Sequence, residues 1–286
     1  MKTVAVANLK GGVGKSTLTL LLAEHWALKL NLRVLVIDLD PQASVSYMLL
    51  SRRGIEACEL ANRTLPQAFI DHDRGAMQPL PAYIEHRASD LRELHGNSRS
   101  FVSLLPSVPS LWLTEYDYDR KLYSNGGDPV AGRRQLLQKF ILKVQRDYEC
   151  VLLDCPPGLV TLTRAALPLA DHIISPTLLD DVSIRSTRDF FELGVERALG
   201  MSDADNRSIV VMKYQNVIEH RANIDALRKH FNVRGDPVPL REQFGKITRR
   251  DHGVLRTYGQ KYEKPRFSPV SRSVTNVAEA LARAIF

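Results

Sequence analysis

The sequence predicts an α/β fold in which helices flank a doubly wound, mainly parallel sheet. Short apolar segments alternate with longer helical patterns through the 286 residues, which is the order of elements in such folds. A glycine-rich stretch at 11–14 stands between the first apolar segment and the first helical one. Two strands run into aspartate, and open parallel sheets bind ligands beyond the carboxyl ends of their strands.

The first unit has the spacing of a βαβ crossover. We expect a buried strand over 4–8, a helix over 15–30 and a second buried strand over 33–38. Continuous apolar strands of this kind are typical of parallel sheets that are covered on both faces. The second strand follows the glycines by about 20 residues, as in a mononucleotide-binding fold.

The remaining elements continue this alternation. The expected strands lie at 101–106, 150–154, 172–175 and 208–213. The expected helices lie at 56–71, 81–95, 111–123, 133–146, 160–170, 182–199, 219–231 and 274–285. We find no clear linker and no internal repeat in this order, so we expect a single domain over residues 1–286.

The glycine-rich stretch has the residue types that bind a polyanion. It comprises Lys10, Gly11, Gly12, Val13, Gly14, Lys15, Ser16 and Thr17. Glycines allow a tight turn whose N–H groups point inward, and the next helix adds its positive N-terminal end. Lys15 supplies a cation for the outer phosphates, and the Ser16 hydroxyl is placed to ligate Mg²⁺. A plain strand-to-helix turn does not explain a Lys-Ser pair after the glycines, so this stretch predicts nucleotide binding.

Acids at two further strand ends can face the same site. Asp38 and Asp40 follow the second strand, and Asp154 ends the strand at 150–154. We expect Asp154 to hold Mg²⁺ through its waters and Asp38 to support the metal shell. Asp40 is the candidate that positions the attacking water for phosphoryl transfer, and a cap on the following helix is the simpler role for it.

Basic charge is concentrated in the last quarter of the chain. The net charge is +7, and from Lys213 onward 15 Lys and Arg stand against 7 Asp and Glu. A one-sided basic surface indicates a polyanionic partner, nucleic acid before anionic lipid, and a solvated basic surface explains the charge equally well. The candidate DNA contacts are Arg221, Arg228 and Lys229 on one expected helix, then Lys246, Arg249, Arg250, Arg256, Lys261, Lys264 and Arg266.

Other classes of protein fit the composition less well. No apolar run approaches the roughly 20 residues that span a membrane, and a strand that starts almost at once leaves no room for a signal peptide. We therefore expect a cytoplasmic protein. Cys58, Cys150 and Cys155 are too few for a disulfide framework, and their spacing matches no zinc pattern. Free, buried thiols are expected.

Three stretches carry a resemblance to a known family. The sequence KGGVGKS at 10–16 resembles the deviant Walker A motif of the ParA/MinD family of ATPases, in which a lysine precedes the glycines. DLDPQ at 38–42 is similar to the family's switch I, closest to the ParA branch, and DCPPG at 154–158 to its Walker B and switch II. The sequence at 253–256 departs from the family's acidic stretch, and the segment around Pro239, which borders the adenine in relatives, matches loosely.

The resemblance implies a P-loop ATPase of the deviant Walker A type, with ATP and Mg²⁺ as cofactors. The family's extra lysine reaches the nucleotide of a second subunit, so an ATP-sandwiched homodimer is implied, with Lys10, Lys15 and Asp40 as catalytic residues. ATP-bound dimers would bind DNA without sequence preference and coat the nucleoid. A separate ParB-like or adaptor protein would stimulate slow hydrolysis, so that a plasmid, chromosome or protein complex is positioned. We expect no helix-turn-helix domain before the glycine loop.

Two other kinds of protein on this scaffold are alternatives. A MinD-like ATPase binds membranes through a C-terminal amphipathic helix, but the helix at 274–285 has an apolar stripe and few charges opposite it, which favours packing in the core. Membrane binding is therefore not expected. A redox protein like the nitrogenase iron protein needs a cysteine pair that holds a cluster between subunits, and Cys150 and Cys155 have the wrong spacing.

Overall fold

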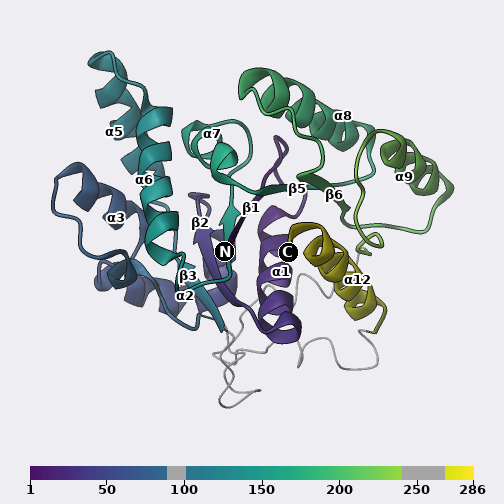
Figure 1. Ribbon diagram of the computed structural model, residues 1–286, viewed down its shortest axis with the longest axis horizontal. Coiled ribbons are helices and arrows are strands. Elements are labelled where there is room, and N and C mark those ends of the chain that lie inside the picture. Colours follow the sequence, from purple (N-terminus) through teal and green to yellow (C-terminus); the bar gives the residue numbers. More distant parts are fainter. Residues whose placement is uncertain (89–100, 240–267) are drawn as a thin grey trace.

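The computed structural model describes residues 1–88, 101–239 and 268–286 (Figure 1). Over these residues, six strands form one parallel sheet in the order β3-β2-β4-β1-β5-β6. The strands are β1 (Lys2–Val6), β2 (Arg33–Asp38), β3 (Phe101–Leu105), β4 (Cys150–Asp154), β5 (His172–Thr177) and β6 (Arg207–Val211). The sheet grows from β1 in both directions, which confirms the predicted doubly wound fold.

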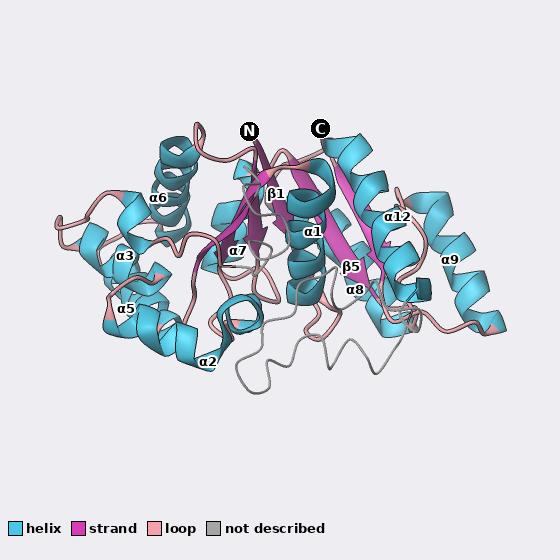
Figure 2. Cartoon of the chain, turned by 90° about the horizontal axis from the view of Figure 1, so that it is seen from below, coloured by secondary structure: helices cyan, strands magenta, loops and turns pink. Residues whose placement is uncertain are grey.

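Helices cover both faces of the sheet (Figure 2). The α-helices are α1 (Lys15–Leu30), α2 (Ser44–Leu60), α3 (Leu65–Asp73), α5 (Leu111–Ser124), α6 (Pro129–Val144), α7 (Thr161–Ala166), α8 (Asp181–Asp189), α9 (Ile218–His230) and α12 (Ser268–Ile285). Short 3₁₀ segments are η1 (Leu80–Tyr83) and η2 (Leu167–Leu169), and η3 (Phe190–Ala198) is a π-helix.

Alternate strand residues supply two separate cores because successive side chains point to opposite faces. Val4 and Val6 pack with residues of α1, α2 and α12 on one face. Ala5 packs with residues of α3, α6 and α7 on the other. Both faces of β1 are therefore buried, which is why its sequence is apolar without alternation.

The last helix packs in the core as its apolar stripe predicts. Val277 and Leu281 of α12 are buried, and α12 lies beside α1 (Figure 1). The indole Nε1 of Trp26 in α1 donates to the carbonyl oxygen of Ala278 at 3.0 Å. Within the described ranges, no helix is both long and apolar enough to cross a bilayer.

The segment after β2 differs from the expected single helix over 56–71. The helix α2 begins earlier, at Ser44, and is kinked at Ser51, whose φ of 63° is not helical. The helix α3 begins separately at Leu65, where the Thr64 hydroxyl oxygen accepts from the N–H of Gln67 at 3.3 Å. The serine-rich start of α2 resembles a loop in sequence, so the pattern concealed it.

The expected helix over 81–95 is wrong in its described part. After η1, Glu85 forms an antiparallel bridge with Leu104 of β3, and the N–H of Ala88 donates to the carbonyl oxygen of Val102. Residues 89–95 lie outside the described ranges. This short segment pairs with β3 at the edge of the sheet, which local helical periodicity does not reveal.

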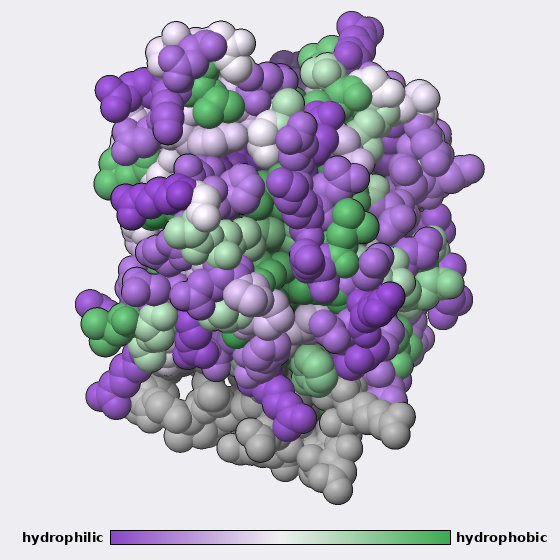
Figure 3. All heavy atoms as spheres, turned by 60° about the vertical axis from the view of Figure 1, so that its left-hand side comes forward, coloured by the Kyte–Doolittle hydropathy of each residue, from purple (hydrophilic) through white to green (hydrophobic). Residues whose placement is uncertain are grey.

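The side of the molecule that carries α3 and α5 is mostly hydrophilic, with small apolar groups (Figure 3). On α5 the rings of Trp112 and Tyr116 stack, with centroids 5.7 Å apart. Both side chains are more than half exposed. These two aromatic side chains of α5 therefore lie at the surface and are not part of the buried core.

Candidate functional site

A pocket of about 590 Å³ lies where the predicted chemistry converges, beyond the carboxyl ends of the central strands. Asp38 and Asp154 are paired in register at the ends of β2 and β4, and Val6 pairs with Asp154 at the end of β1. The pocket is lined by Gly11, Gly12, Gly14, Lys15, Ser16, Thr17, Asp40, Gln42, Ser44, Tyr47, Met48, Pro157 and Lys213. The fold thus brings the glycine loop and the acids together.

The glycine loop between β1 and α1 has the backbone that the motif predicts. Gly12 and Gly14 have φ values of 75° and 100°, a region that glycine enters without strain. Within the described chain, α1 has no side-chain cap at Gly14. The first N–H groups of an α-helix have no intrahelical partners, so with the positive helix end they are available to bind an anion.

Asn8 anchors the start of the loop, and the sequence analysis missed it. Its Nδ2 donates at 3.0 Å to Ser175 Oγ, to the Pro176 carbonyl oxygen and to Thr187 Oγ1. Its Oδ1 accepts from the N–H of Lys10 at 3.0 Å. These partners lie more than 160 residues away except Lys10, so no local pattern reveals them.

Lys15 is 6% exposed and turns back onto the loop. Its Nζ donates to the carbonyl oxygen of Lys10 at 3.3 Å. Burial lowers the pKa of Lys15, while the nearby Asp154 and Asp40 carboxyls act to raise it. A partly desolvated ammonium beside an anion site is suited to bind a phosphate oxygen.

The surroundings of Asp154 compensate the charge of its carboxylate only in part. It is fully buried, and its Oδ1 accepts from Thr19 Oγ1 at 2.9 Å. Its Oδ2 is buried with no hydrogen-bond partner among the described residues. Burial raises its pKa to about 7, and Asp40 adds to this rise, while hydrogen bonds from Ser16 and Thr19 oppose it.

The donor set around Asp154 fits Mg²⁺ held with a phosphate. A cation beside Asp154 and the Ser16 hydroxyl would offset the buried charge. The described residues contain no group of three or more His, Cys, Asp or Glu that could hold a metal by themselves. Mg²⁺ in nucleotide sites takes one or two protein ligands and completes its shell with phosphate and water.

Asp38 organises the loop that follows β2. Its Oδ2 accepts from the N–H and the Oγ of Ser46, at 3.1 and 2.6 Å, and its Oδ1 from the N–H of Asp40 at 3.0 Å. The Ser46 hydroxyl oxygen in turn accepts from the N–H of Ser107. Burial and the neighbouring Asp154 raise the pKa of Asp38. Its role in the metal shell stays a prediction.

Asp40 borders the pocket and does not cap a helix. Its Oδ1 accepts from the N–H of Gln42 at 2.9 Å, which forms a local turn. The N-cap of α2 is Ala43, so the simpler role of a helix cap is wrong. The carboxylate lines the pocket together with Lys15.

The extra lysine is bound within its own chain. Lys10 Nζ donates to Asp180 Oδ1 at 3.1 Å and to Ser183 Oγ at 2.7 Å. Asp180 is also the N-cap of α8, where it accepts from the N–H of Ser183. Burial raises the pKa of Asp180, but the hydrogen bonds from Ser183 and Lys10 outweigh it and lower the pKa to about 2.

The described candidates for DNA contact lie on α9. Arg221 bonds to Asn216, and Arg228 lies 3.9 Å from the carboxylate of Asp225. Arg221 and Arg228 are seven residues apart and share a face, and Lys229 is turned by about 100° from Arg228. The other candidates, at 246, 249, 250, 256, 261, 264 and 266, lie outside the described residues.

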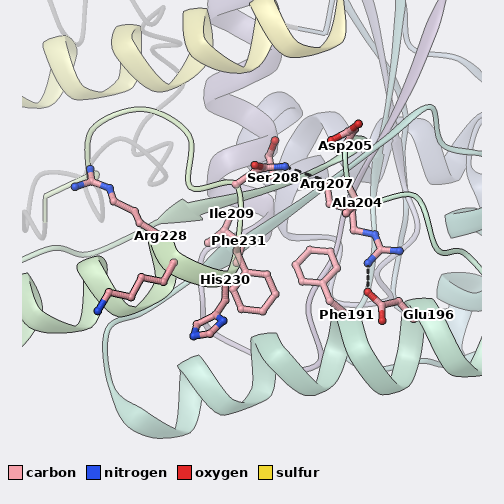
Figure 4. A pocket seen from close by; sticks show the side chains of 12 residues that line it. Phe191, Glu196, Ala204, Asp205, Arg207, Ser208, Ile209, Arg228, His230 and Phe231 are labelled. Atoms are coloured by element: carbon pink, nitrogen blue, oxygen red, sulfur yellow. Dashed lines mark hydrogen bonds and ion pairs between the residues drawn. The ribbon is translucent and has the colours of Figure 1, made fainter.

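A second pocket, of about 350 Å³, lies at the amino end of β6 between η3 and the end of α9. Figure 4 shows the rings of Phe191 and Phe231 next to each other and Arg207 bonded to Glu196, at 2.6 Å. It lies at the opposite end of β6 from the glycine loop and has no glycine in its lining. This pocket lacks the features of the nucleotide site.

The cysteines behave as expected for structural thiols. Cys58, Cys150 and Cys155 are free and buried. Burial raises the pKa of each of the three thiols, so none is a reactive thiolate. Cys150 and Cys155 are fully buried at the two ends of β4, which argues against a cluster held between subunits.

Comparison with known proteins gives one matching family model. Residues 1–193 match the model described as "AAA domain". A putative replication protein A from Rhizobium rhizogenes is 32% identical over 189 residues, which cover 64% of this chain and 42% of that protein. The chromosome-partitioning ATPase Soj of Treponema pallidum is 27% identical over 175 residues, covering 61% and 56%. The first of these matches thus spans less than half of the relative.

A solved structure has the same fold over nearly the full chain. It is a putative plasmid partition protein from Borrelia burgdorferi bound to AMPPNP, with a TM-score of 0.70. The two chains are 20% identical, and the match covers 99% of each.

Proposed function

Because the chain belongs to the ParA/MinD-like AAA-domain family, we propose that it is an ATPase that binds ATP with Mg²⁺ in the pocket at the glycine loop. The observation that carries the proposal is that two buried, oppositely charged groups, Lys15 and Asp154, are electrostatic neighbours at the glycine loop, while Asp154 Oδ2 has no hydrogen-bond partner among the described residues. Together they leave a place for a phosphate on one side and a cation on the other. A structural turn would need neither group to be buried.

The residues of the glycine loop and the nearby acids have separate roles in the proposed phosphoryl transfer. The N–H groups of 11–17 cradle the phosphates, and Lys15 leaves the Lys10 carbonyl oxygen to bind an outer phosphate oxygen. Ser16 and Asp154 hold Mg²⁺, with Asp38 behind them. The metal would neutralise charge that develops on the phosphate oxygens. Asp40 lines the pocket and orients the attacking water.

We further propose a homodimer that closes around ATP. Lys10 leaves Asp180 and Ser183 and reaches the nucleotide of the partner subunit. Since Lys10 and Asp180 are 31% and 48% exposed, solvent screens their ion pair and little free energy is needed to break it. Hydrolysis would return Lys10 to its own chain and release the dimer.

A positioning role on DNA is the favoured cellular function. Two of the similar proteins are named for chromosome partitioning and plasmid partition. The basic last quarter supports salt-sensitive contact with phosphates. A separate ParB-like or adaptor protein would stimulate hydrolysis at the nucleoid. A MinD-like membrane role is the alternative, and the burial of the α12 stripe counts against it.

The test combines nucleotide and DNA binding. Wild type should hydrolyse ATP slowly with Mg²⁺. Lys15→Ala should bind ATP more weakly by roughly tenfold or more, because a hydrogen bond to a charged group is lost. Binding to arbitrary duplex DNA is measured with ATP, ADP or no nucleotide over a salt series. ATP-selective binding that weakens with salt is expected. No ATP binding by wild type would refute the ATPase, and ATP binding without DNA binding would refute only the nucleoid role.

A further inference from the structure

A third lysine, 201 positions away from Gly12 in the sequence, contacts the glycine loop. Lys213 lies two residues after β6, and its Nζ donates to the carbonyl oxygen of Gly12 at 3.0 Å. It lines the same pocket as Lys15 and Asp40. The motif at 10–17 does not include this residue, and the roles proposed above do not use it.

The backbone of Lys213 is held in a conformation that lysine rarely adopts. Its φ is 55°, in the left-handed region, which is unfavourable for a residue with a Cβ. Hydrogen bonds fix both neighbours: the N–H of Met212 donates to Thr177, and that of Tyr214 to Val238, each at 2.8 Å. The fold therefore imposes this conformation. Strained backbone conformations of this kind are often found at functional sites.

The same strand end touches the loop at a second point. A Cβ on Gly14 would lie 3.2 Å from the Cε of Met212. The loop is thus packed against Met212 on one side and bonded to Lys213 at Gly12. The conformation of the loop depends on the end of β6 as well as on its own glycines.

The charge of Lys213 is the one most open to a ligand. Lys10 is paired with Asp180, and Lys15 is buried beside Asp154. Lys213 is exposed, and no carboxylate lies within ion-pair distance of it among the described residues. A polyphosphate in the pocket would meet this ammonium at the rim, where its charge adds to that of Lys15.

We propose that Lys213 is a positioning residue of the nucleotide site. By holding the Gly12 carbonyl outward it keeps the loop N–H groups directed at the polyphosphate, and its ammonium adds positive charge beside that polyphosphate. The inference rests on the proposed nucleotide binding and deepens it, since it assigns part of the affinity to a residue outside the motif.

The test uses substitutions that separate charge from packing. Lys213→Met keeps the aliphatic stem and removes the donor, and Lys213→Arg restores a cationic donor. The control is Lys139→Met, an exposed lysine on α6. Fluorescent ATP and ADP analogues are titrated with Mg²⁺ over a salt series, and kcat, KM and the midpoint of thermal unfolding are measured for each protein.

We expect Lys213→Met to raise both Kd and KM by about 3- to 10-fold, the usual net effect of losing one ordinary hydrogen bond. Its affinity should depend less on salt, because one cation is lost. Lys213→Arg should return Kd to within about twofold of wild type. The unfolding midpoint without nucleotide should not change, and Lys139→Met should match wild type throughout.

Wild-type Kd and salt dependence in Lys213→Met would overturn the inference. A higher Kd that arginine does not restore, together with a lower unfolding midpoint, would overturn it too, because it would assign Lys213 a purely structural role. Lys15→Ala separates this result from the parent proposal. If Lys15→Ala loses binding while Lys213→Met retains it, only the inference fails. If wild type does not bind nucleotide, both fail.

Discussion

Asp154 carries an electrostatic cost that a bound cation would remove. Its pKa of about 7 in the folded chain lies above its ordinary value of 3.8, chiefly because of burial. Between these two values the folded chain binds the proton more tightly than the unfolded chain does. The free energy of unfolding therefore falls as pH rises through this range. The loss of stability reaches its full size above about pH 7.

Asp154→Asn should stabilise the ligand-free protein at pH 8, since it removes the buried charge. We expect the midpoint of thermal unfolding to rise by roughly 3–6 °C at pH 8, and by less at pH 5.5, where wild type is largely protonated. Mg²⁺ with ATP should then add little further stability to the variant. Asp147→Asn, at an exposed position, is the control. Equal destabilisation by Asp154→Asn at both pH values would contradict this account.

The contact between Lys10 and Asp180 gives a second prediction at the scale of a single residue. Asp180→Asn keeps an N-cap on α8, since Asn caps as well as Asp, but removes the charge that holds Lys10. With AMPPNP, the variant should dimerise at a concentration about 2- to 5-fold lower than wild type, because exposed ion pairs contribute little. Sedimentation velocity gives the dimerisation constant.

Asp181→Asn is the matched control for this measurement, because Asp181 lies in the first turn of the same helix and has no ion pair with Lys10 in the described residues. Weaker dimerisation of Asp180→Asn would contradict this account. It would mean that the Asp180 carboxylate stabilises the closed dimer and not the separate chain.

Single residues differed in how far the sequence predicted them. Lys15 follows from the glycine motif, and Asp40 and Asp154 follow from their places at the ends of strands. The fold brings the three charges close together. Asn8 and Lys213 were missed because their contacts join residues more than 160 positions apart. Only the folded sheet brings such residues into contact.

At the scale of elements, the buried strands were the most predictable. A parallel strand covered on both faces is an apolar run with an unmistakable pattern, and each expected strand lies within two residues of a strand in the structure. Two failures have local causes. Ser51 kinks α2, and Glu85 pairs with β3 across the sheet. The π-helix η3 directly follows α8, and the expected helix over 182–199 covers both without distinguishing them.

The packing of α12 on α1 gives a prediction at this scale. Leu281→Ala should lower the free energy of unfolding by about 2–4 kcal/mol, because the buried side chain leaves a cavity. Urea unfolding measures the change. Arg283→Ala, on the exposed side of the same helix, is the control and should change stability by less than about 0.5 kcal/mol.

Liposome sedimentation with ATP extends this test to the membrane alternative. We expect no pelleting of wild type, because the apolar stripe of α12 is buried against the core. Pelleting that Leu281→Ala abolishes would mean that α12 detaches to bind lipid, and would favour the MinD-like role.

At the scale of the whole molecule, the phosphate loop and the basic helix α9 lie in different parts of one sheet-based fold. The loop sits at the carboxyl end of β1, and α9 packs at the β6 side (Figure 1). Lys213 and α9 both follow β6 within a few residues. A change at the nucleotide site therefore has a short covalent route to the candidate DNA contacts. The single-domain organisation stays a prediction.

The double variant Arg221→Ala, Arg228→Ala tests whether α9 contacts DNA. Each phosphate contact contributes about 0.9 to the slope of log affinity against log salt, so the loss of two should flatten that slope by roughly 1.8. The affinity for any duplex sequence should fall to a similar degree, because phosphate contacts carry no sequence information. Arg283→Ala should leave the slope unchanged.

Since Arg228 lies near Asp225, Asp225→Asn should strengthen binding if α9 faces the DNA. An unchanged slope in the double variant would place any DNA contact outside α9, with the basic residues that follow position 240 as the next candidates.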